Sequence, residues 1–577
     1  MPLKTRATPA GVAGYTDGVR IRCATWEPSP RMTPLRDPSL RRREQPASPP
    51  RRRKHWGWGF EDQQPPHEQV EAAAAAARDH LGFPPAEVER PVPLEQIELA
   101  PSMLEPPASL AQICATDRYE RVTHSYGKSY RDVVRAFRGR FQNPTDVVAH
   151  PADEADVERV LAWCEDAGAA AIPFGGGTSV VGGVEPPGDR PSVTIDLRSM
   201  DRVLDVNRVS RAALIQAGAT GPRLEEQLRE HGLTLRHFPQ SFEFSTLGGW
   251  IATRAGGHYA TLHTHIDDFV ESIRALTPRG LWQSRRLPAS GAGPSPDRML
   301  IGSEGILGVI TEAWMRLQAA PRFKESAAIL FDSFGSGARA VRALSQSGLD
   351  PSNCRLLDGE EAGLTGAVPE GTTADPRPAL LVLGFESADH ELGPWMSRAL
   401  ELCEDHGGRV RPSTRKRDGR GESETAWRDA FLQAPYLRDT LVAAGIFVET
   451  FETAVTWDRF DELVGTVRER TRQALGGDGI VTCRLTHVYP DGAAPYFTVL
   501  APARRGDELA QWDELKAAAS DVIAAGGGTI THHHAVGRDH RSWYDRQRPA
   551  PFAAAVRAAK GAVDPAGTLN PGVLIDS

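Results

Sequence analysis

The chain has 577 residues, which is too many for one hydrophobic core, so two or three domains are expected. A content of 40% hydrophobic and 25% charged residues is ordinary for a globular protein, and no run of 18 apolar residues occurs, which excludes a transmembrane helix. The six cysteines are scattered and form no C-x-x-C pair. This pattern argues against a structural zinc site or a disulfide framework and predicts a cytoplasmic protein.

The net charge of −8 is distributed unevenly along the chain. Residues 1–54 contain 13 Lys and Arg but 4 Asp and Glu, so this segment carries +9 and the remainder −17. Its Pro, Ser and Arg content and its lack of apolar periodicity predict a disordered basic tail. An inert extension is the simplest interpretation, and contact with an anionic surface or a targeting role are the alternatives. A basic tail on an acidic body gives no indication of nucleic-acid binding.

Residues 55–140 are predicted to form an N-terminal helical segment, and a domain of alternating strands and helices follows over 141–320. The segment begins with His55-Trp56-Gly57-Trp58-Gly59 and contains an alanine-rich helix at 66–81. The predicted elements of the domain are strands at 146–149, 169–174, 192–196, 213–217, 270–277 and 307–317, and helices at 151–167 and 222–231.

The next region, residues 321–530, predicts an α+β domain with an antiparallel sheet. Its first elements are strand 327–332, helix 336–347, strands 354–358 and 379–386 and helix 391–405, and a second such set follows. A hairpin at residues 481–500 turns at Asp491-Gly492. Alternation along its first strand predicts one shared face for Cys483, Leu485, His487 and Tyr489. Residues 531–577 form a separate C-terminal segment.

A glycine-rich loop at residues 173–183 is the strongest functional signal. Gly175, Gly176 and Gly177 permit positive φ and expose the backbone, so consecutive N–H groups can form an anion-binding nest. The Thr178 and Ser179 hydroxyls add further donors.

Two commoner phosphate-binding loops are excluded. The loop is not a Rossmann fingerprint, because the Val180-Val181-Gly182-Gly183 that follows is a poor helix start. Gly127-Lys128-Ser129 is not a P-loop, because Val122 stands where the first glycine belongs. Two more loops of small residues follow strands, at 239–253 and 302–311. Three such loops indicate one extended ligand, as a dinucleotide would be.

Seven motifs in order resemble the alkyldihydroxyacetonephosphate synthase group of the vanillyl-alcohol oxidase/p-cresol methylhydroxylase superfamily. They are PFGGGTSV, EFSTLGGW, TPRG, GSEGILGVITEA, YLRD, HVYPDGAAPYF and THHHAVG. The resemblance implies an α+β fold: an FAD-binding domain of two subdomains, a cap domain that holds substrate over the flavin, and a C-terminal segment that completes the active site. It departs from the group at Gln240, where an acidic residue is expected, and at His263-Thr264, where a Tyr-Gly is expected.

The resemblance also implies the residues of the site. FAD would be bound through Pro173, Phe174, Gly175, Gly176, Gly177, Thr178, Ser179, Val180, Pro239, Gln240, Ser241, Ser245, Thr246, Gly249, Thr253, Glu304, Gly305, Gly308, Val309 and Ile310. The catalytic residues would be Tyr496 as general base, Arg438, His237, His532, His533 and His534. Arg438 would also bind substrate, as would Arg355, which matches a structurally important arginine.

Each of these assignments has a plainer alternative. Tyr496 can be an ordinary strand tyrosine, and Arg438 a surface ion-pair partner. His532 and His534 would share one face of a strand and could give two metal ligands. No third ligand follows at a usual spacing, so we expect no metal. A structural histidine cluster is the other alternative for His532, His533 and His534.

The resemblance implies an enzyme of ether-lipid synthesis, which replaces the acyl group of acyl-dihydroxyacetone phosphate by a fatty alcohol without net electron transfer. The alternative is an FAD-dependent oxidoreductase for a 2-hydroxy acid or related alcohol, and a non-enzymatic flavin-binding module is a third. A small-molecule or lipid-like substrate, no nucleic acid, and a cytoplasmic protein at the membrane periphery are expected, with a homodimer left open.

Overall fold

The computed structural model describes residues 51–576, apart from 264, 368–376 and 412–421, and for 422–432 it describes the backbone course alone. Residues 1–50 of the predicted tail therefore lie outside the described residues. Residues 51–54, which we assigned to the tail, contact the folded chain: Lys54 is buried and its ammonium group lies 2.5 Å from the Asp439 carboxylate.

Two sheets form the part of the molecule that carries the glycine-rich loop. The first has the order β1-β2-β4-β3, in which β2, β4 and β3 run parallel. The second is antiparallel, with the order β5-β6-β10-β8-β9. Their strands are β1 (Cys114–Ala115), β2 (Val147–Ala149), β3 (Ala170–Phe174), β4 (Ser192–Asp196), β5 (Val203–Asn207), β6 (Ala212–Gln216), β8 (Val270–Thr277), β9 (Gly280–Gln283) and β10 (Val309–Arg316). A short pair joins β7 (Leu233–Thr234) to β11 (Gln318–Ala319).

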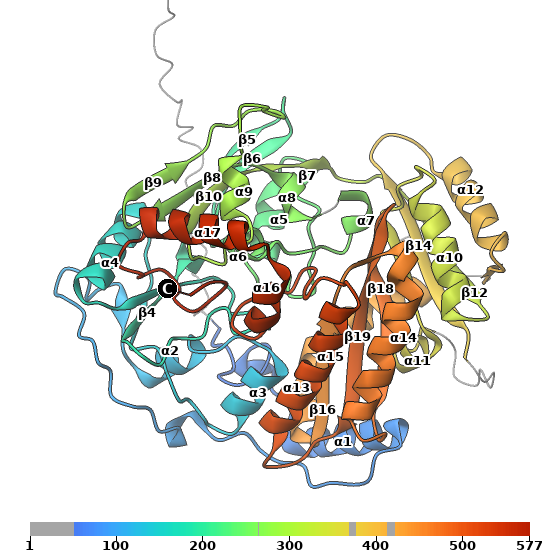
Figure 1. Ribbon diagram of the computed structural model, residues 1–577, viewed down its shortest axis with the longest axis horizontal. Coiled ribbons are helices and arrows are strands. Elements are labelled where there is room, and N and C mark those ends of the chain that lie inside the picture. Colours follow the sequence, from blue (N-terminus) through green and yellow to red (C-terminus); the bar gives the residue numbers. More distant parts are fainter. Residues whose placement is uncertain (1–50, 264, 368–376, 412–421, 577) are drawn as a thin grey trace, which may run out of the picture. The chain divides into compact units, whose positions relative to one another are not determined.

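One apolar core joins these two sheets and the helices beside them. It contains Val193 and Ile195 of β4, Ile215 of β6 and Met315 of β10. The helices of this part are α4 (Glu154–Asp166), α5 (Gly221–Arg229), α6 (Leu247–Thr253), α7 (Ala260–His263), α8 (Ile266–Phe269), α9 (Pro296–Leu300), α16 (Arg541–Gln547) and α17 (Ala550–Val563). The last two lie against it from the far end of the chain (Figure 1).

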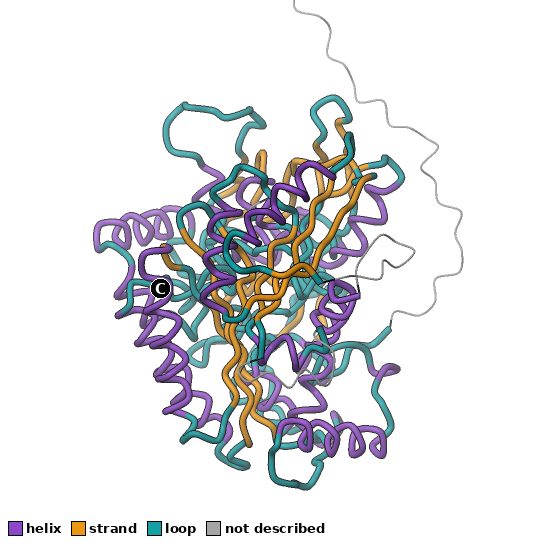
Figure 2. Tube along the Cα trace, turned by 90° about the vertical axis from the view of Figure 1, so that its right-hand side faces the viewer, coloured by secondary structure: helices purple, strands orange, loops and turns teal. Residues whose placement is uncertain are grey.

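The larger sheet is antiparallel, with the order β15-β12-β14-β13-β18-β19-β16, and β17 also pairs with β19. Its strands are β12 (Phe323–Phe331), β13 (Asn353–Leu357), β14 (Ala379–Ser387), β15 (Arg409–Val410), β16 (Ile446–Glu452), β17 (Val455–Thr456), β18 (Ile480–Val488) and β19 (Gly492–Pro502). Its helices are α10 (Phe334–Ser345), α11 (Gly359–Leu364), α12 (Gly393–Glu404), α13 (Glu422–Ala443), α14 (Trp457–Ala474) and α15 (Glu508–Ala525). Figure 2 shows strands gathered inside and helices outside.

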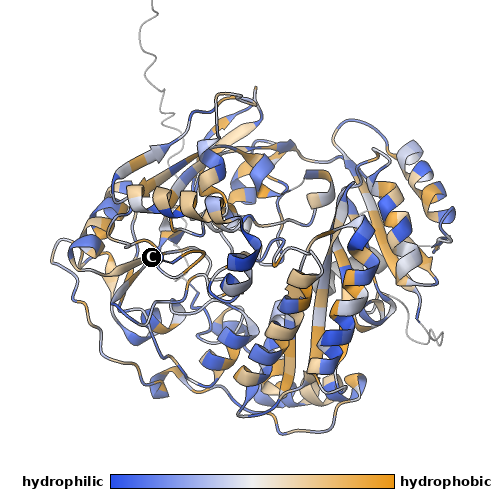
Figure 3. Cartoon of the chain, viewed as in Figure 1, coloured by the Kyte–Doolittle hydropathy of each residue, from blue (hydrophilic) through white to orange (hydrophobic). Residues whose placement is uncertain are grey.

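Alternation along the strands separates two faces of the large sheet. Cys483, Leu485, Phe497 and Val499 belong to the apolar core that includes α10 and α14 side chains. The outer surface of α14 is mostly hydrophilic, whereas the strands beneath it are mostly hydrophobic (Figure 3). Residues that alternate with them along the strands, such as Arg484 and Tyr496, line a pocket on the opposite face.

The predicted face of the hairpin strand is wrong. The register between β18 and β19 shifts between Leu485 and His487, so Thr486 is an extra residue in the ladder. This bulge moves His487 to the pocket side, away from Cys483 and Leu485, which stay in the core. Strict alternation cannot anticipate a bulge, because the bulge depends on the pairing with β19.

The N-terminal segment of the described chain supports both parts. It contains η2 (Glu61–Gln63), α1 (His67–Leu81), η3 (Leu94–Gln96), α2 (Arg118–Thr123) and α3 (Tyr130–Phe137), and η4 (Leu197–Ser199) follows β4 later in the chain. Tyr130 packs on Phe447 of the large sheet, and β1 pairs with β2. The predicted α+β fold with an antiparallel cap sheet is confirmed, and each predicted element occurs within four residues of its expected bounds. No described helix is long and apolar enough to cross a membrane.

Candidate active site

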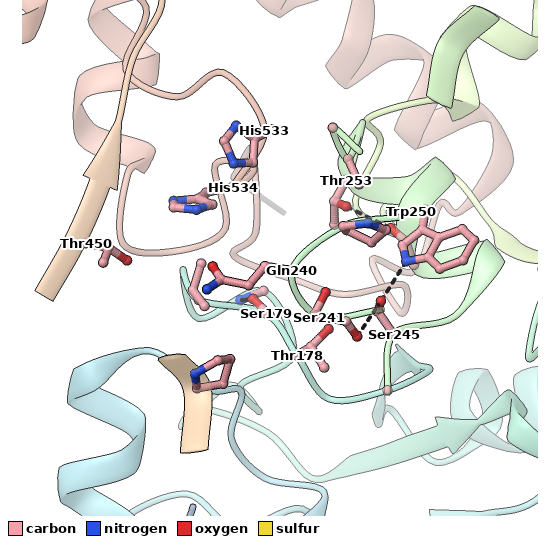
Figure 4. A pocket seen from close by; sticks show the side chains of 18 of the residues that line it. Thr178, Ser179, Gln240, Ser241, Ser245, Trp250, Thr253, Thr450, His533 and His534 are labelled. Atoms are coloured by element: carbon pink, nitrogen blue, oxygen red, sulfur yellow. Dashed lines mark hydrogen bonds between the residues drawn. The ribbon is translucent and has the colours of Figure 1, made fainter. Parts of the chain in front are cut away.

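A pocket of about 500 Å³ opens between the three small-residue loops and the face of the large sheet that carries Arg484 and Tyr496. Figure 4 shows Thr178 and Ser179 of the first loop beside Ser241 and Ser245 of the second, with His533 and His534 across the cavity. This volume is typical of a site for a small molecule or cofactor.

Two carbonyl groups of the glycine-rich loop accept hydrogen bonds, whereas the N–H groups of residues 176–180 remain available to a ligand. The Gly176 carbonyl accepts a 2.5 Å hydrogen bond from Arg53, and the Ser179 carbonyl accepts one from the Lys128 N–H. Among the described residues, none accepts a hydrogen bond from the N–H groups of residues 176–180. Gly177 has φ +63°, which favours glycine. The arrangement is a ready anion-binding nest.

Glycine is also required here for close packing. A Cβ on Gly175 would lie 2.1 Å from the Thr246 hydroxyl, and one on Gly176 would lie 2.1 Å from the Phe244 carbonyl oxygen. The first and second loops therefore touch through backbone, which brings both to the same side of the pocket.

The second loop is braced internally. The Ser245 hydroxyl accepts a 2.7 Å hydrogen bond from the Trp250 indole and donates to the Ser241 carbonyl. The Thr253 hydroxyl donates to the Gly249 carbonyl. These bonds hold the loop open toward the cavity.

Glu304 ties the third loop to the C-terminal segment. Its carboxylate accepts hydrogen bonds from the Val536 and Gly537 N–H groups, at 2.9 and 2.8 Å. Burial raises the pKa of Glu304 to about 7, although these two donors oppose the shift. Asn570 adds a second tie by donating to the carbonyls of Gly183 and Glu304.

Of the predicted cofactor residues, all except Val309 line the pocket. Val309 is fully buried in the core instead, because it begins β10 and its side chain points between the sheets. Its neighbours Gly308 and Ile310 do line the pocket.

Tyr496 faces the pocket from β19 and is 4% exposed. Its cross-strand partner is Arg484, whose guanidinium lies 3.9 Å from the centre of the tyrosine ring. Burial raises the pKa of Tyr496, while Arg484 and the Thr450 hydroxyl act in the opposite direction. Tyr496 is therefore a neutral phenol at rest, beside a cation that stabilises its ionised form.

Arg484 is held by a buried ion pair with Glu361 of α11. The second Glu361 oxygen accepts a 2.7 Å hydrogen bond from the Thr482 hydroxyl. Both partners are nearly inaccessible, with side-chain exposures of 9% and 6%. The pair fixes the guanidinium over Tyr496.

The YLRD motif lies in the last part of α13 and links three regions. Arg438 lines the pocket. The Tyr436 hydroxyl donates a 2.6 Å hydrogen bond to Glu243 in the second loop, and Asp439 pairs with Lys54 and accepts from the Trp58 N–H. The helix is thereby anchored on both sides of Arg438.

Arg355 reaches the same pocket from β13 and donates to the His258 carbonyl at 3.2 Å. Burial, with Arg484 nearby, lowers the pKa of Arg355 to about 9, so it stays charged at neutral pH. Three arginines thus converge on one cavity.

The triple histidine forms a turn around the buried carboxylate of Glu452. That carboxylate accepts hydrogen bonds from the N–H groups of His532, His533 and His534, at 2.6, 3.1 and 3.0 Å. His533 and His534 line the pocket, whereas His532 lies behind them. Burial lowers the pKa of all three rings, so they are neutral at pH 7.

Ring nitrogens of His487, His532 and His533 lie within 4.8 Å of one another. His532 Nε2, however, faces the Tyr489 hydroxyl at 2.9 Å and His265 Nε2 at 3.0 Å. These are hydrogen-bond distances, and we interpret the cluster as a hydrogen-bonded network.

His237 does not reach the pocket. It is 1% exposed and packs against Trp250 and Phe269, with ring centres 4.9 and 5.9 Å away. Neither ring nitrogen has a partner among the described residues, and burial lowers the pKa of His237 to about 3. The placement gives a neutral core histidine, which does not support the predicted catalytic contact.

Several lining residues escaped the sequence analysis. Arg484, Glu361 and His487 stand on strands and a helix whose pairing brings them together only in the fold. In the sequence, only the CRLTH string of the hairpin could have pointed to Arg484. Whether Arg484 lies on the same face as Tyr496 depends on the register between β18 and β19, which the sequence does not give.

Comparisons with known proteins agree with this geometry. Residues 145–284 match the FAD binding domain family, and residues 320–574 match the C-terminal domain of FAD linked oxidases. Alkyldihydroxyacetonephosphate synthase of Dictyostelium discoideum is 32% identical over 484 residues, covering 80% of this chain and 78% of that protein. The chain belongs to the alkyldihydroxyacetonephosphate synthase family. It is an FAD-dependent enzyme.

Several further proteins are similar to this synthase-family chain. The alkyldihydroxyacetonephosphate synthase of Trypanosoma brucei brucei is 29% identical, covering 80% of this chain and 78% of that protein. The mitochondrial D-lactate dehydrogenase (cytochrome) of Arabidopsis thaliana is 26% identical, covering 80% of this chain and 77% of that protein. A solved alkyldihydroxyacetonephosphate synthase structure has a TM-score of 0.74 at 26% identity, covering 90% of this chain and 98% of the other. The p-cresol methylhydroxylase structure has a TM-score of 0.64 at 16% sequence identity, so it supports the fold alone.

The residues present fit FAD. The N–H groups of residues 176–180 have no acceptor among the described residues and could bind a pyrophosphate, and the small side chains of the second loop line the pocket beside them. The rest of the pocket carries the arginines, Tyr496 and the histidines on the other side.

Proposed function

We propose that the enzyme exchanges the acyl group of acyl-dihydroxyacetone phosphate for a fatty alcohol. The observation that supports this most is the convergence of Arg355, Arg438 and Arg484 with Tyr496 on the pocket that holds the glycine cradle. Among the described lining residues there is no Asp or Lys, and the two Glu, Glu304 and Glu361, are already engaged. Such a surplus of guanidinium groups suits a phosphate ester.

An apolar end of the same pocket suits a long alkyl chain. It is formed by Trp58 of the N-terminal segment and by aliphatic side chains of α11, α13, β16 and β19, namely Leu364, Leu437, Leu441, Val448 and Leu500. A small hydroxy acid would leave this surface unused, whereas burial of a chain gains about 0.8 kcal/mol per methylene group.

The reaction breaks the bond between substrate C1 and the acyl oxygen, and joins C1 to the alcohol oxygen. The carboxylate leaves, and the alcohol proton is released. When bound, FAD supplies a ring that accepts and returns electron density at the reacting carbon, so no net oxidation results.

This chain's residues would bind the phosphate and manage protons. We assign Arg355 and Arg438 to the phosphate. Tyr496 would take the proton from C1 after its own proton has moved away, Arg484 would stabilise the tyrosinate, and a proton would return to C1 once the ether bond has formed. His533 and His534, whose rings lie 6.0 and 5.5 Å from the Tyr496 ring, are the adjacent groups that can receive protons.

The alternative is oxidation of a 2-hydroxy acid, in which Arg438 would grip the carboxylate. The 26% sequence identity to D-lactate dehydrogenase supports this alternative, and the 32% identity to the synthase supports the exchange reaction. The apolar end of the pocket favours the lipid substrate.

Labelled hexadecanol tests the proposal. Incubated with palmitoyl-dihydroxyacetone phosphate, the wild type should incorporate label into an ether product. Tyr496→Phe and Arg438→Lys should each lose at least 100-fold in rate while they retain bound flavin, and Tyr544→Phe on α16 is the matched control. Full activity in both site variants would refute the assignment.

We further propose a cytoplasmic enzyme that contacts membranes peripherally, because its substrates partition into lipid. We also propose a homodimer. Cell fractionation and light scattering of the purified protein test these two points, and a tightly extracted integral protein or a strict monomer would contradict them.

A further inference from the structure

A second groove of about 710 Å³, here called the outer groove, has Thr529, just before the histidine turn, in its lining. It is lined by the hairpin turn after β18, including Tyr489 and Asp491, and by the ends of α15 and α16, including Asp521 and Arg546. Tyr489 is partly exposed there. The groove shares no lining residue with the cofactor pocket.

A continuous chain of hydrogen-bonding groups connects the two cavities. His533 lines the cofactor pocket, and its Nδ1 lies 3.1 Å from His532 Nδ1. His532 Nε2 lies 2.9 Å from the Tyr489 hydroxyl and 3.0 Å from His265 Nε2. His265 Nε2 and the Tyr489 hydroxyl are themselves 2.9 Å apart.

This series of hydrogen-bonding groups is oriented for proton transfer. His265 Nδ1 faces the Arg254 carbonyl at 3.2 Å, and an N–H donated to that carbonyl leaves Nε2 as the acceptor in the neutral ring. His532 joins the inner and outer groups through its two opposite nitrogens, so a proton taken up at Nδ1 can be released from Nε2.

The Glu452 carboxylate favours a positive charge on the rings while a proton passes. It is fully buried, and it holds the turn through the N–H groups of residues 532–534 and the Thr531 hydroxyl at 2.7 Å. Burial would raise the pKa of Glu452, but the three histidines outweigh it and hold that pKa well below its usual range. Asp267, Asp491 and Arg254 are the other charged groups that act on the outer end.

We propose that His533, His532 and the Tyr489–His265 pair form a proton path from the cofactor pocket to the outer groove. The inference rests on the proposed function, in which an ester and an alcohol yield an ether and a carboxylic acid. At neutral pH that acid ionises, so each turnover releases one proton into the pocket. The proton passes from His533 to His532, then to Tyr489 or His265, and on to water or a buffer base.

The double variant Tyr489→Phe/His265→Asn removes both outer groups, and Tyr544→Phe/His231→Asn is the matched control on other surfaces. In weak buffer, kcat of the first should fall at least tenfold and its solvent deuterium isotope effect should rise. Flavin content and thermal stability should match the wild type, and imidazole should restore the rate with increasing concentration. Unchanged kcat and isotope effect in the folded double variant would overturn the path.

Two further measurements keep the path separate from the proposed function. Nuclear magnetic resonance of ¹⁵N-histidine protein should show hydrogen-bonded ring N–H signals that disappear in the double variant, whether or not alcohol exchange occurs. If the wild type exchanges no alcohol, the proposed function fails while this signal is still required. Absence of the signal, or a stoichiometric metal ion found by elemental analysis of the purified holoenzyme, would overturn the path.

Discussion

The glycine cradle can be tested by one added methyl group. In Gly176→Ala the new Cβ would lie 2.1 Å from the Phe244 carbonyl oxygen and 2.9 Å from the Ser245 Cα, closer than real Cβ atoms approach. Both neighbours are backbone atoms, so the first and second loops must separate by about 1 Å, which is an overpacking effect. Such strain costs about 1–3 kcal/mol.

The separation acts where the cofactor binds, because both loops line the pocket. If the whole strain opposes FAD binding, the Kd rises about 5- to 150-fold. Titration of apoprotein with FAD, followed by flavin fluorescence, measures this. Gly561→Ala is the matched control, because a Cβ there meets nothing within 4 Å and the position is helical. A Kd within twofold of the wild type for Gly176→Ala would refute the reasoning.

Three further outcomes follow from buried charges. Arg484→Gln removes the cation beside Tyr496, so the basic pKa in the pH profile of kcat should rise by about 1–2 units. Asp439→Asn leaves the Lys54 ammonium buried without its carboxylate, which should lower the free energy of unfolding in urea by about 3–5 kcal/mol. Folded Glu304 has a pKa of about 7, above the ordinary 4.5, so its contribution to stability is full below pH 4.5 and is lost as the pH rises to 7. Glu304→Gln should flatten that slope.

Exposed residues of the same types serve as controls for these variants: Arg229→Gln, Asp205→Asn and Glu158→Gln. An unshifted pH profile for Arg484→Gln contradicts its role beside Tyr496. A loss below 1 kcal/mol for Asp439→Asn contradicts the buried pair. If Glu304→Gln leaves the pH dependence of the free energy of unfolding unaltered, Glu304 is not the cause of that dependence.

Local signals in the sequence predicted the three small-residue loops of the cofactor side, whereas the individual cofactor residues came from the family resemblance. The strand before Gly175 and the three consecutive glycines are neighbours in sequence, and their conformation depends on residues close by. The predicted bounds of strands 192–196 and 270–277 agree with β4 and β8 for the same reason, since apolar runs end at clear turns.

The substrate side depends on contacts between distant segments. Arg484 meets Tyr496 only through the β18–β19 register, and Glu361 arrives from a helix more than 100 residues earlier. Glu452 organises the histidine turn from about 80 residues away. His237 adjoins a cofactor loop in sequence, yet its ring turns into the core against Trp250. Burial of this kind is a tertiary property, which residue type and spacing do not encode.

The central claim is exchange without net oxidation, and the flavin spectrum tests it most directly. Under anaerobic conditions, with palmitoyl-dihydroxyacetone phosphate and hexadecanol, ether and fatty acid should form in equal amounts while the oxidised flavin absorbance persists in the steady state. Addition of D-lactate or D-2-hydroxyglutarate should leave that absorbance unchanged. Rapid bleaching by either acid, with no ether formed from the lipid pair, would contradict the account.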